Sequence, residues 1–221
     1  MRQWRICAAV LLLVACGWAQ TEPPQKAEPH GPSPKPDTTG AEPWEYSLTV
    51  DGYIIPDGTS YVSPTFTADH DWVHLEARYN YENLRTGSLW AGYNFSWGKK
   101  WQFEVTPMIG GVFGRTNGIA PGCEASLEWK RLTFSIDNEY VFDTTSKTGN
   151  FYYSWPQITY KALDWLKFGL VAQHTKAFQP NAELERGFFV TLKHKKYEFT
   201  TYAFNPGISG TSVVLEVGAE F

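Results

Sequence analysis

Three polar side chains of this sequence could together carry out nucleophilic chemistry on an ester. Ser154 offers a hydroxyl nucleophile, His174 a base to accept its proton, and Asn138 an amide to orient the imidazole. A nucleophile, a base and an orienting group are what acyl transfer and ester hydrolysis require. The serine lies in no GxSxG motif. The hypothesis therefore depends on whether the fold brings the three side chains together.

The other candidate site is a set of charged side chains that alternate with apolar residues. If they share one face, the carboxylates between Glu76 and Glu139 form one wall, and lysines further along the chain form another. Opposite charges across a water-filled passage would select polar solutes. Carboxylates outnumber bases here, and unpaired carboxylates need water beside them, whereas paired ones would fill a closed interior. The predicted lumen-lining residues are Asp51, Glu76, Arg78, Glu104, Glu124, Glu128, Asp137, Glu139, Lys161, Lys167 and Lys193, with Arg131, Glu198, Glu216 and Glu220 on the same face.

The spacing of the 3 cysteines and 5 histidines does not indicate a metal site or a cofactor site. There is no CxxC pair and no zinc-binding spacing, so we expect neither a metal nor a cofactor. Cys123 lies alone in the predicted folded part, and we interpret it as a small apolar side chain. His74 falls on the charged face.

Strands must position both candidate sites, because the apolar pattern from Trp44 onward has a period of two. Leu89, Ala91, Tyr93, Phe95 and Trp97 alternate with Ser88, Gly92, Asn94 and Ser96. The same alternation predicts that Phe134 and Ile136 share one face and that Ser135 and Asp137 share the other. It also places Asn138, Ser154 and His174 on the apolar face, although Pro156 predicts a bulge that would turn Ser154 to the charged face.

Short polar turns and longer loops alternate along residues 44–221. The predicted turns centre on 69–71, 98–100, 130–131, 163–164 and 195–196, and the predicted loops span 56–59, 82–87, 113–118, 144–150, 178–183 and 205–210. Turns and loops in strict alternation predict an antiparallel up-and-down sheet of about 12 strands. That leaves about 15 residues per strand and connection, enough for a tilted strand that crosses a bilayer.

The N-terminal region is predicted to be an export signal followed by an extended arm. Basic residues, an apolar stretch over residues 6–15, and small residues at Gly17 and Ala19 fit a signal peptide over residues 1–19. The sequence LVACG also matches a lipobox, which would place a lipid on Cys16. Residues 20–43 are rich in proline and lack large apolar side chains, so we predict a disordered periplasmic arm.

The folded part resembles Gram-negative bacterial outer-membrane β-barrels. Two features carry the resemblance: aromatic residues beside the short turns, and a terminal strand, Val213-Leu215-Val217-Ala219-Phe221, that ends in phenylalanine. The resemblance implies a transmembrane barrel over residues 44–221, with outer-membrane lipids and the barrel-assembly machinery as partners, and the arm and C-terminus in the periplasm. A soluble lipocalin-like or sandwich domain is the alternative.

Charge and composition then reduce the number of function classes that fit the sequence. A net charge of −4 and a pI near 5.7 do not fit a nucleic-acid-binding protein, which would carry a basic surface. We expect a narrow, porin-like channel for small polar solutes or ions rather than an enzyme. The alternatives are a lipid hydrolase or acyltransferase that uses Ser154, His174 and Asn138, and a non-conducting structural barrel.

Overall fold

The structure is a computed structural model that describes residues 43–56, 58–145, 149–174, 184–207 and 211–221. The predicted signal peptide and nearly all of the predicted arm lie outside these residues. Among the described residues, no helix is long and apolar enough to cross a bilayer.

The described part of the chain folds into thirteen strand segments. Their alternating β-branched and aromatic residues suit a pleated surface with one apolar face. In chain order the segments are β1 (Glu45–Ile54), β2 (Tyr61–His70), β3 (Val73–Tyr79), β4 (Thr86–Tyr93), β5 (Phe95–Trp97), β6 (Gln102–Gly114), β7 (Gly118–Trp129), β8 (Leu132–Asp143), β9 (Phe151–Leu163), β10 (Leu166–His174), β11 (Leu184–His194), β12 (Tyr197–Phe204) and β13 (Ser212–Glu220).

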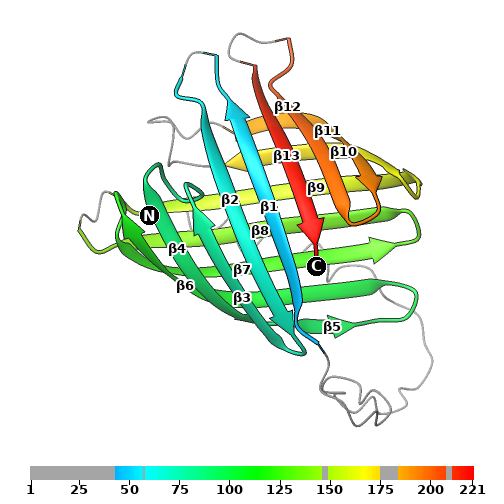
Figure 1. The fold of residues 1–221 in the computed structure, drawn as a ribbon, viewed down its shortest axis with the longest axis horizontal. Coiled ribbons are helices and arrows are strands. Elements are labelled where there is room, and N and C mark those ends of the chain that lie inside the picture. Colours follow the sequence, from blue (N-terminus) through cyan, green and yellow to red (C-terminus); the bar gives the residue numbers. More distant parts are fainter. Residues whose placement is uncertain (1–42, 57, 146–148, 175–183, 208–210) are drawn as a thin grey trace, which may run out of the picture. The chain divides into compact units, whose positions relative to one another are not determined.

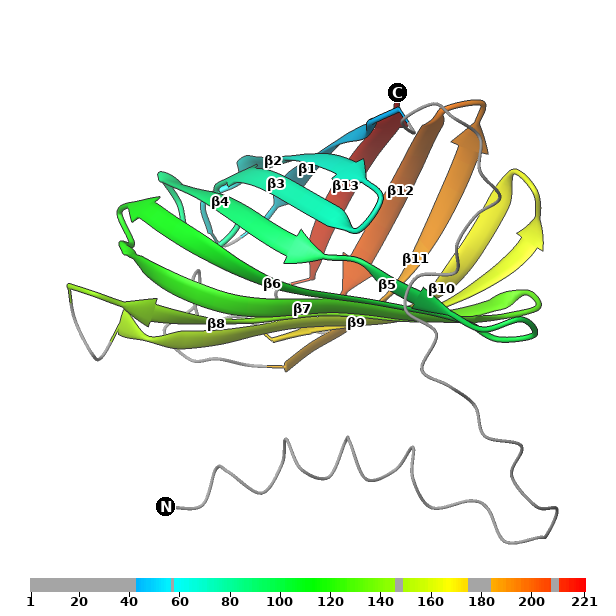
Figure 2. The same ribbon diagram turned by 90° about the horizontal axis from the view of Figure 1, so that it is seen from below.

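The segments close into an antiparallel barrel. Each strand pairs with its neighbours in sequence, and β1 pairs with β13. Both β4 and β5 pair with β6, so they are two parts of one strand interrupted at Asn94. The barrel therefore has twelve strands, as the alternation of turns and loops predicted (Figures 1 and 2).

Tight turns join the strands at one end of the barrel. The β2–β3, β7–β8 and β11–β12 turns each contain a residue in the left-handed region, namely Asp71 (φ 53°), Lys130 (φ 58°) and Lys195 (φ 57°). The other six connections, such as the one between β3 and β4, lie at the opposite end, which we call the long-connection end. Connections at the two ends alternate as predicted, but the β6–β7 connection spans only residues 115–117 and is shorter than the predicted loop over residues 113–118.

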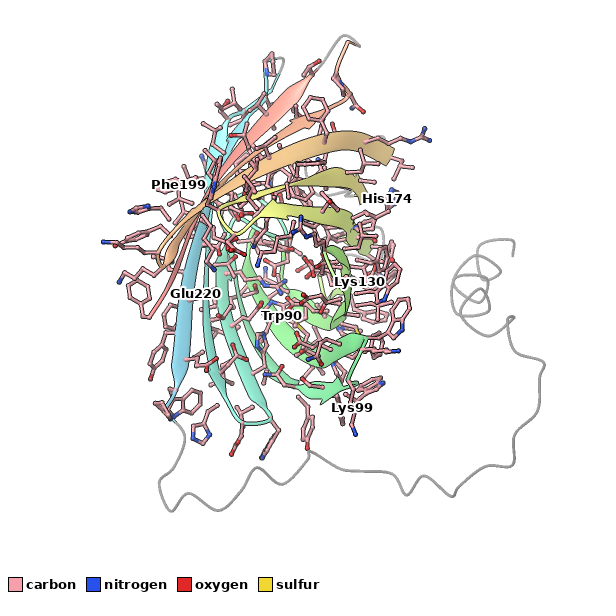
Figure 3. The ribbon with its side chains drawn as sticks, turned by 90° about the vertical axis from the view of Figure 1, so that its right-hand side faces the viewer. Trp90, Lys99, Lys130, His174, Phe199 and Glu220 are labelled. Atoms are coloured by element: carbon pink, nitrogen blue, oxygen red, sulfur yellow. The ribbon has the colours of Figure 1, made fainter. Side chains whose placement is uncertain are left out.

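The two faces of the barrel differ in polarity. Large apolar side chains point outward and stay exposed, including Leu89 (60%), Phe134 (43%) and Leu170 (63%), whereas polar and charged groups are buried inside. Figure 3 shows the contrast, with Trp90 inside the ring of strands and Phe199 outside it. A soluble protein would bury the apolar face. An exposed apolar belt instead fits a lipid environment, and it is flanked at the short turns by the exposed aromatics Trp72, Trp97, Trp101, Trp129, Trp165 and Tyr197.

Candidate functional site

A buried arginine organises the middle of the barrel interior. Arg78 of β3 is 7% exposed. Its Nε donates a hydrogen bond to Glu76 Oε2, its Nη1 to Glu139 Oε2 at 3.0 Å, and its Nη2 to Glu124 Oε1 at 3.3 Å. Arg78 is therefore fully compensated by carboxylates from three strands, which a buried guanidinium requires.

Aromatic rings cover the same guanidinium. Its carbon lies 4.4 Å from the ring centroid of Tyr81 and 4.7 Å from that of Trp90. Such cation–π contacts strengthen when water is excluded. The Arg78 centre thus combines charge pairing with ring stacking at one level of the barrel.

The loop between β3 and β4 folds into the barrel rather than away from it. The Tyr81 hydroxyl donates to the Tyr153 hydroxyl at 3.2 Å, and the two ring centroids are 5.2 Å apart. Glu82, only 1% exposed, accepts hydrogen bonds from Ser88 Oγ at 2.5 Å and Trp90 Nε1 at 3.2 Å. The loop therefore fills part of the interior. The sequence predicted a loop over residues 82–87 and did not indicate that it turns inward.

Apolar side chains fill the rest of the interior near the long connections. Two clusters pack there, and small residues make room for them: a Cβ on Gly122 would lie 2.9 Å from the Trp90 ring. The clusters consist of Tyr153, Trp155, Val171, Phe189, Tyr202, Phe204 and Val214, and of Trp90, Met108, Val112, Ala120, Val141 and Phe151. The long-connection half of the barrel is thus largely packed.

Two adjoining cavities lie in the part of the barrel interior that the structure describes. A central cavity of about 210 Å³ lies beside Arg78. A second, of about 550 Å³, reaches the β7–β8 and β9–β10 turns. Gln157, Tyr202 and Glu216 line both. The open part of the lumen therefore runs from the short-turn end to the Arg78 centre.

The predicted lumen residues fall into these regions, apart from one. Glu104 shares the inward face of β6 with Met108, but it is exposed near the strand end and lines neither cavity. Glu139 is bound to Arg78. The central cavity is lined by Asp51, Glu76, Arg78, Glu124 and Asp137, and the second by Glu128, Lys161, Lys167 and Lys193.

The charges separate along the lumen. Lysines surround the second cavity, where Lys167 Nζ lies 2.9 Å and Lys193 Nζ 3.1 Å from Glu198 Oε1. Carboxylates dominate the central cavity. The sequence predicted an acidic wall and a basic wall, whereas the carboxylates of the central cavity also include Asp51 of β1 and Glu216 of β13. The axial separation was not predicted, because it depends on where each residue lies along its strand.

The alternative site is on the outer face. Ser154 of β9 pairs with Asn138 of β8 on one side and with His174 of β10 on the other. The expected bulge at Pro156 is wrong, because Pro156 keeps the regular register opposite Ile136. Ser154 therefore stays on the outward face.

Asn138, Ser154 and His174 lie side by side on β8, β9 and β10, but not in the order that a catalytic triad needs. Ser154 lies between the other two, whereas the imidazole must lie between nucleophile and orienting group. Asn138 Oδ1 instead accepts a hydrogen bond from the Tyr152 hydroxyl at 2.6 Å. In the portion of the chain described, no hydrogen bond joins Ser154 to His174. The arrangement gives the imidazole no orienting partner.

Comparison with known proteins places the fold. No protein-family model matches the sequence, and no curated protein matches it. The barrel is similar to the KdgM porin, with a TM-score of 0.54 and 14% identity over 79% of this chain and 98% of that chain. The KdgM porin in complex with disordered oligogalacturonate gives a TM-score of 0.57 at 14% identity over 79% and 99%. Omp33 of Acinetobacter baumannii gives 0.48 at 8% identity over 80% and 98%.

The similarity extends over the whole barrel and concerns its fold. Together with the exposed apolar belt, it confirms a β-barrel of the Gram-negative outer-membrane type, as the terminal strand and the aromatic residues predicted. The first two of these structures are of a porin.

Proposed function

We propose that the chain is a narrow outer-membrane channel for small polar solutes with a weak preference for cations. One observation carries the proposal: the central cavity is lined by five carboxylates and one arginine, and it adjoins a second cavity that reaches the short-turn end. Asp51 and Asp137 line the central cavity, and among the described residues no ion pair holds either of them. Rings of acidic side chains favour cations in pores.

The porin-like fold supports the proposal that the protein is a channel. It does not support the proposal that the protein transports the same solute as a porin of similar fold. One similar structure is a porin in complex with oligogalacturonate, a chain of negatively charged sugars. Here the central cavity is lined by five carboxylates and one arginine. A polyanion would be repelled there, although the lysines of the second cavity could attract anions to the short-turn mouth. We therefore propose small cations and neutral solutes.

The position of the two ends of the barrel sequence supports an orientation in the membrane. Phe221 N donates to Tyr46 O at 2.8 Å, so both ends of the barrel sequence lie at the short-turn end. Short turns are periplasmic in outer-membrane barrels. We propose that the arm and the C-terminus are periplasmic and that the wider cavity opens to the periplasm.

Ion permeation through planar bilayers tests the proposal. The purified protein should conduct small ions, and Asp137→Asn and Asp51→Asn should lower the ratio of cation to anion permeability. Asp71→Asn is the matched control, because it removes an exposed turn carboxylate at a left-handed position that asparagine tolerates. A ratio that falls equally in all three variants would contradict the assigned role of the central cavity.

A non-conducting barrel is the second candidate, and the packed aromatic half favours it. In that case the wild-type protein passes no ions. Tyr81→Ala, which removes the ring beneath Tyr153, should increase conductance if the inward loop is the constriction. Lipid hydrolysis is the less supported alternative, and phospholipase activity abolished by Ser154→Ala would establish it.

A further inference from the structure

We propose that the lumen wall contains a binding site for a divalent transition metal such as Zn²⁺, with His74, Glu76 and Glu124 as ligands. One potential ligand atom from each of these residues lies within 4.8 Å of the others. His74 and Glu76 are each 6% exposed, and Glu124 borders the central cavity. Sequence spacing gave no hint of this site, because its residues come from β3 and β7.

A hydrogen-bond chain fixes the orientation of the imidazole. His74 Nδ1 lies 2.7 Å from Asp69 Oδ1, which also accepts a hydrogen bond from Asn94 Nδ2 at 2.8 Å. Asn94 Oδ1 in turn accepts one from the Thr106 hydroxyl at 2.7 Å. A carboxylate that holds one ring nitrogen is the usual support of a metal-binding histidine. It leaves Nε2 with its lone pair free to bind a metal.

That second nitrogen has no hydrogen-bond partner although it is buried. His74 Nε2 is among the few such side-chain atoms in the described part of the chain. It lies 3.2 Å from Glu76 Oε1, but without hydrogen-bonding geometry. Two ligands of tetrahedral zinc with bonds of about 2.0–2.1 Å are separated by about 3.3 Å. The two atoms are therefore spaced as ligands of one ion.

The surrounding charge favours a cation despite the nearby arginine. Arg78 binds Oε2 of Glu76, which leaves Oε1 for the metal. Asp69, Glu139 and Asp137 add further negative charge around the group. The central cavity can supply water as a fourth ligand. An imidazole with carboxylates suits Zn²⁺ better than Mg²⁺, which prefers an all-oxygen octahedron.

Zn²⁺ titration of the metal-free, detergent-solubilised full chain by calorimetry tests the site. We expect one Zn²⁺ per chain at neutral pH and no competition from Mg²⁺. His74→Asn keeps a donor for Asp69 but removes Nε2, and should weaken binding at least tenfold, as should Glu124→Gln. Asp69→Asn should weaken it by about 10–100-fold, the usual effect of losing a ligand's support.

His194→Asn is the matched control, since His194 is exposed at the end of β11. It should leave Zn²⁺ affinity unchanged, and heat-modifiable migration on gels should show that every variant is folded. Zn²⁺ affinity that survives both His74→Asn and Glu124→Gln would overturn the proposal. So would an absence of stoichiometric binding in the wild type, which would indicate that a proton on His74 occupies the space between Nε2 and Glu76. Visible absorption of bound Co²⁺ gives a second measurement, and a spectrum without tetrahedral character would also count against the site.

Discussion

Adjacent substitutions on β8 provide the sharpest test of the membrane register. Ile136 faces outward beside Ala125 and Pro156, whereas Ser135 faces the lumen beside Ser126 and Gln157. Ile136→Arg would place a charge against lipid. Ser135→Arg would place the same charge inside, on the face that also carries Asp137 and Glu128.

The cost of the first substitution depends on its depth in the bilayer. A strand that rises about 3.4 Å per residue and tilts by about 40° advances about 2.6 Å per residue along the membrane normal. Ile136 lies four residues beyond Leu132, the first residue of β8, and therefore about 10 Å into an apolar band about 25 Å tall. Arginine near the midplane costs about 2–4 kcal/mol, or about 30- to 700-fold in the folding equilibrium. Phe134, closer to the turn, should tolerate arginine better.

Folding into lipid vesicles, followed by denaturant titration and by heat-modifiable migration on gels, measures this difference. Ile136→Arg should lower the free energy of unfolding by the amount given above, and Ser135→Arg should change it by less than about 1 kcal/mol. A one-residue slip of register would exchange the two results. Equal tolerance at both positions would mean that β8 does not cross a bilayer and would refute the membrane barrel.

Two further pairs of matched substitutions test the packing and the charge pairing inside the barrel. Gly110→Ala would drive a Cβ into the Trp90 ring, whereas Gly111→Ala would point into open space; denaturant titration should show a loss of about 1–3 kcal/mol for the first and almost none for the second. Arg78→Met would leave buried Glu76 and Glu139 without their cation and should cost about 3–5 kcal/mol, while the exposed Arg186→Met should stay within about 0.5 kcal/mol. An equal loss of stability in both members of either pair would contradict the packing described here.

The sequence predicted the barrel well because its evidence is local and repeated. Each strand alternates in polarity, and each tight turn carries polar or left-handed residues, so an error in one strand is corrected by its neighbours. Inward and outward faces follow from the same alternation. This is why most predicted lumen residues, such as Asp51 and Lys193, border a cavity.

Features that depend on depth or on pairing across the barrel could not be predicted in this way. Alternation cannot show that the loop carrying Tyr81 and Glu82 turns inward, because loops have no period. It cannot show that His74 of β3 meets Glu124 of β7, since that contact depends on barrel closure. The bulge expected at Pro156 failed because an outward-facing proline opposite Ile136 fits without a shift of register.

The distribution of residue size along the barrel indicates where the proposed channel would be narrowest. Glycines at positions 110 and 122 leave room for the Trp90 ring. The long-connection half is therefore filled by side chains of the strands. The short-turn half contains the larger of the two adjoining cavities. Arg78 and Tyr81 form a single layer between the two halves of the barrel. Carboxylates hold Arg78 in place, and the loop between β3 and β4 carries Tyr81. This loop is held by side-chain hydrogen bonds instead of a strand ladder, from Tyr81 to Tyr153 and from Ser88 and Trp90 to Glu82. If the barrel conducts small solutes, as proposed above, the layer of Arg78 and Tyr81 is where the open lumen meets the packed half, and Tyr81 is the residue of that layer whose removal should change permeation most.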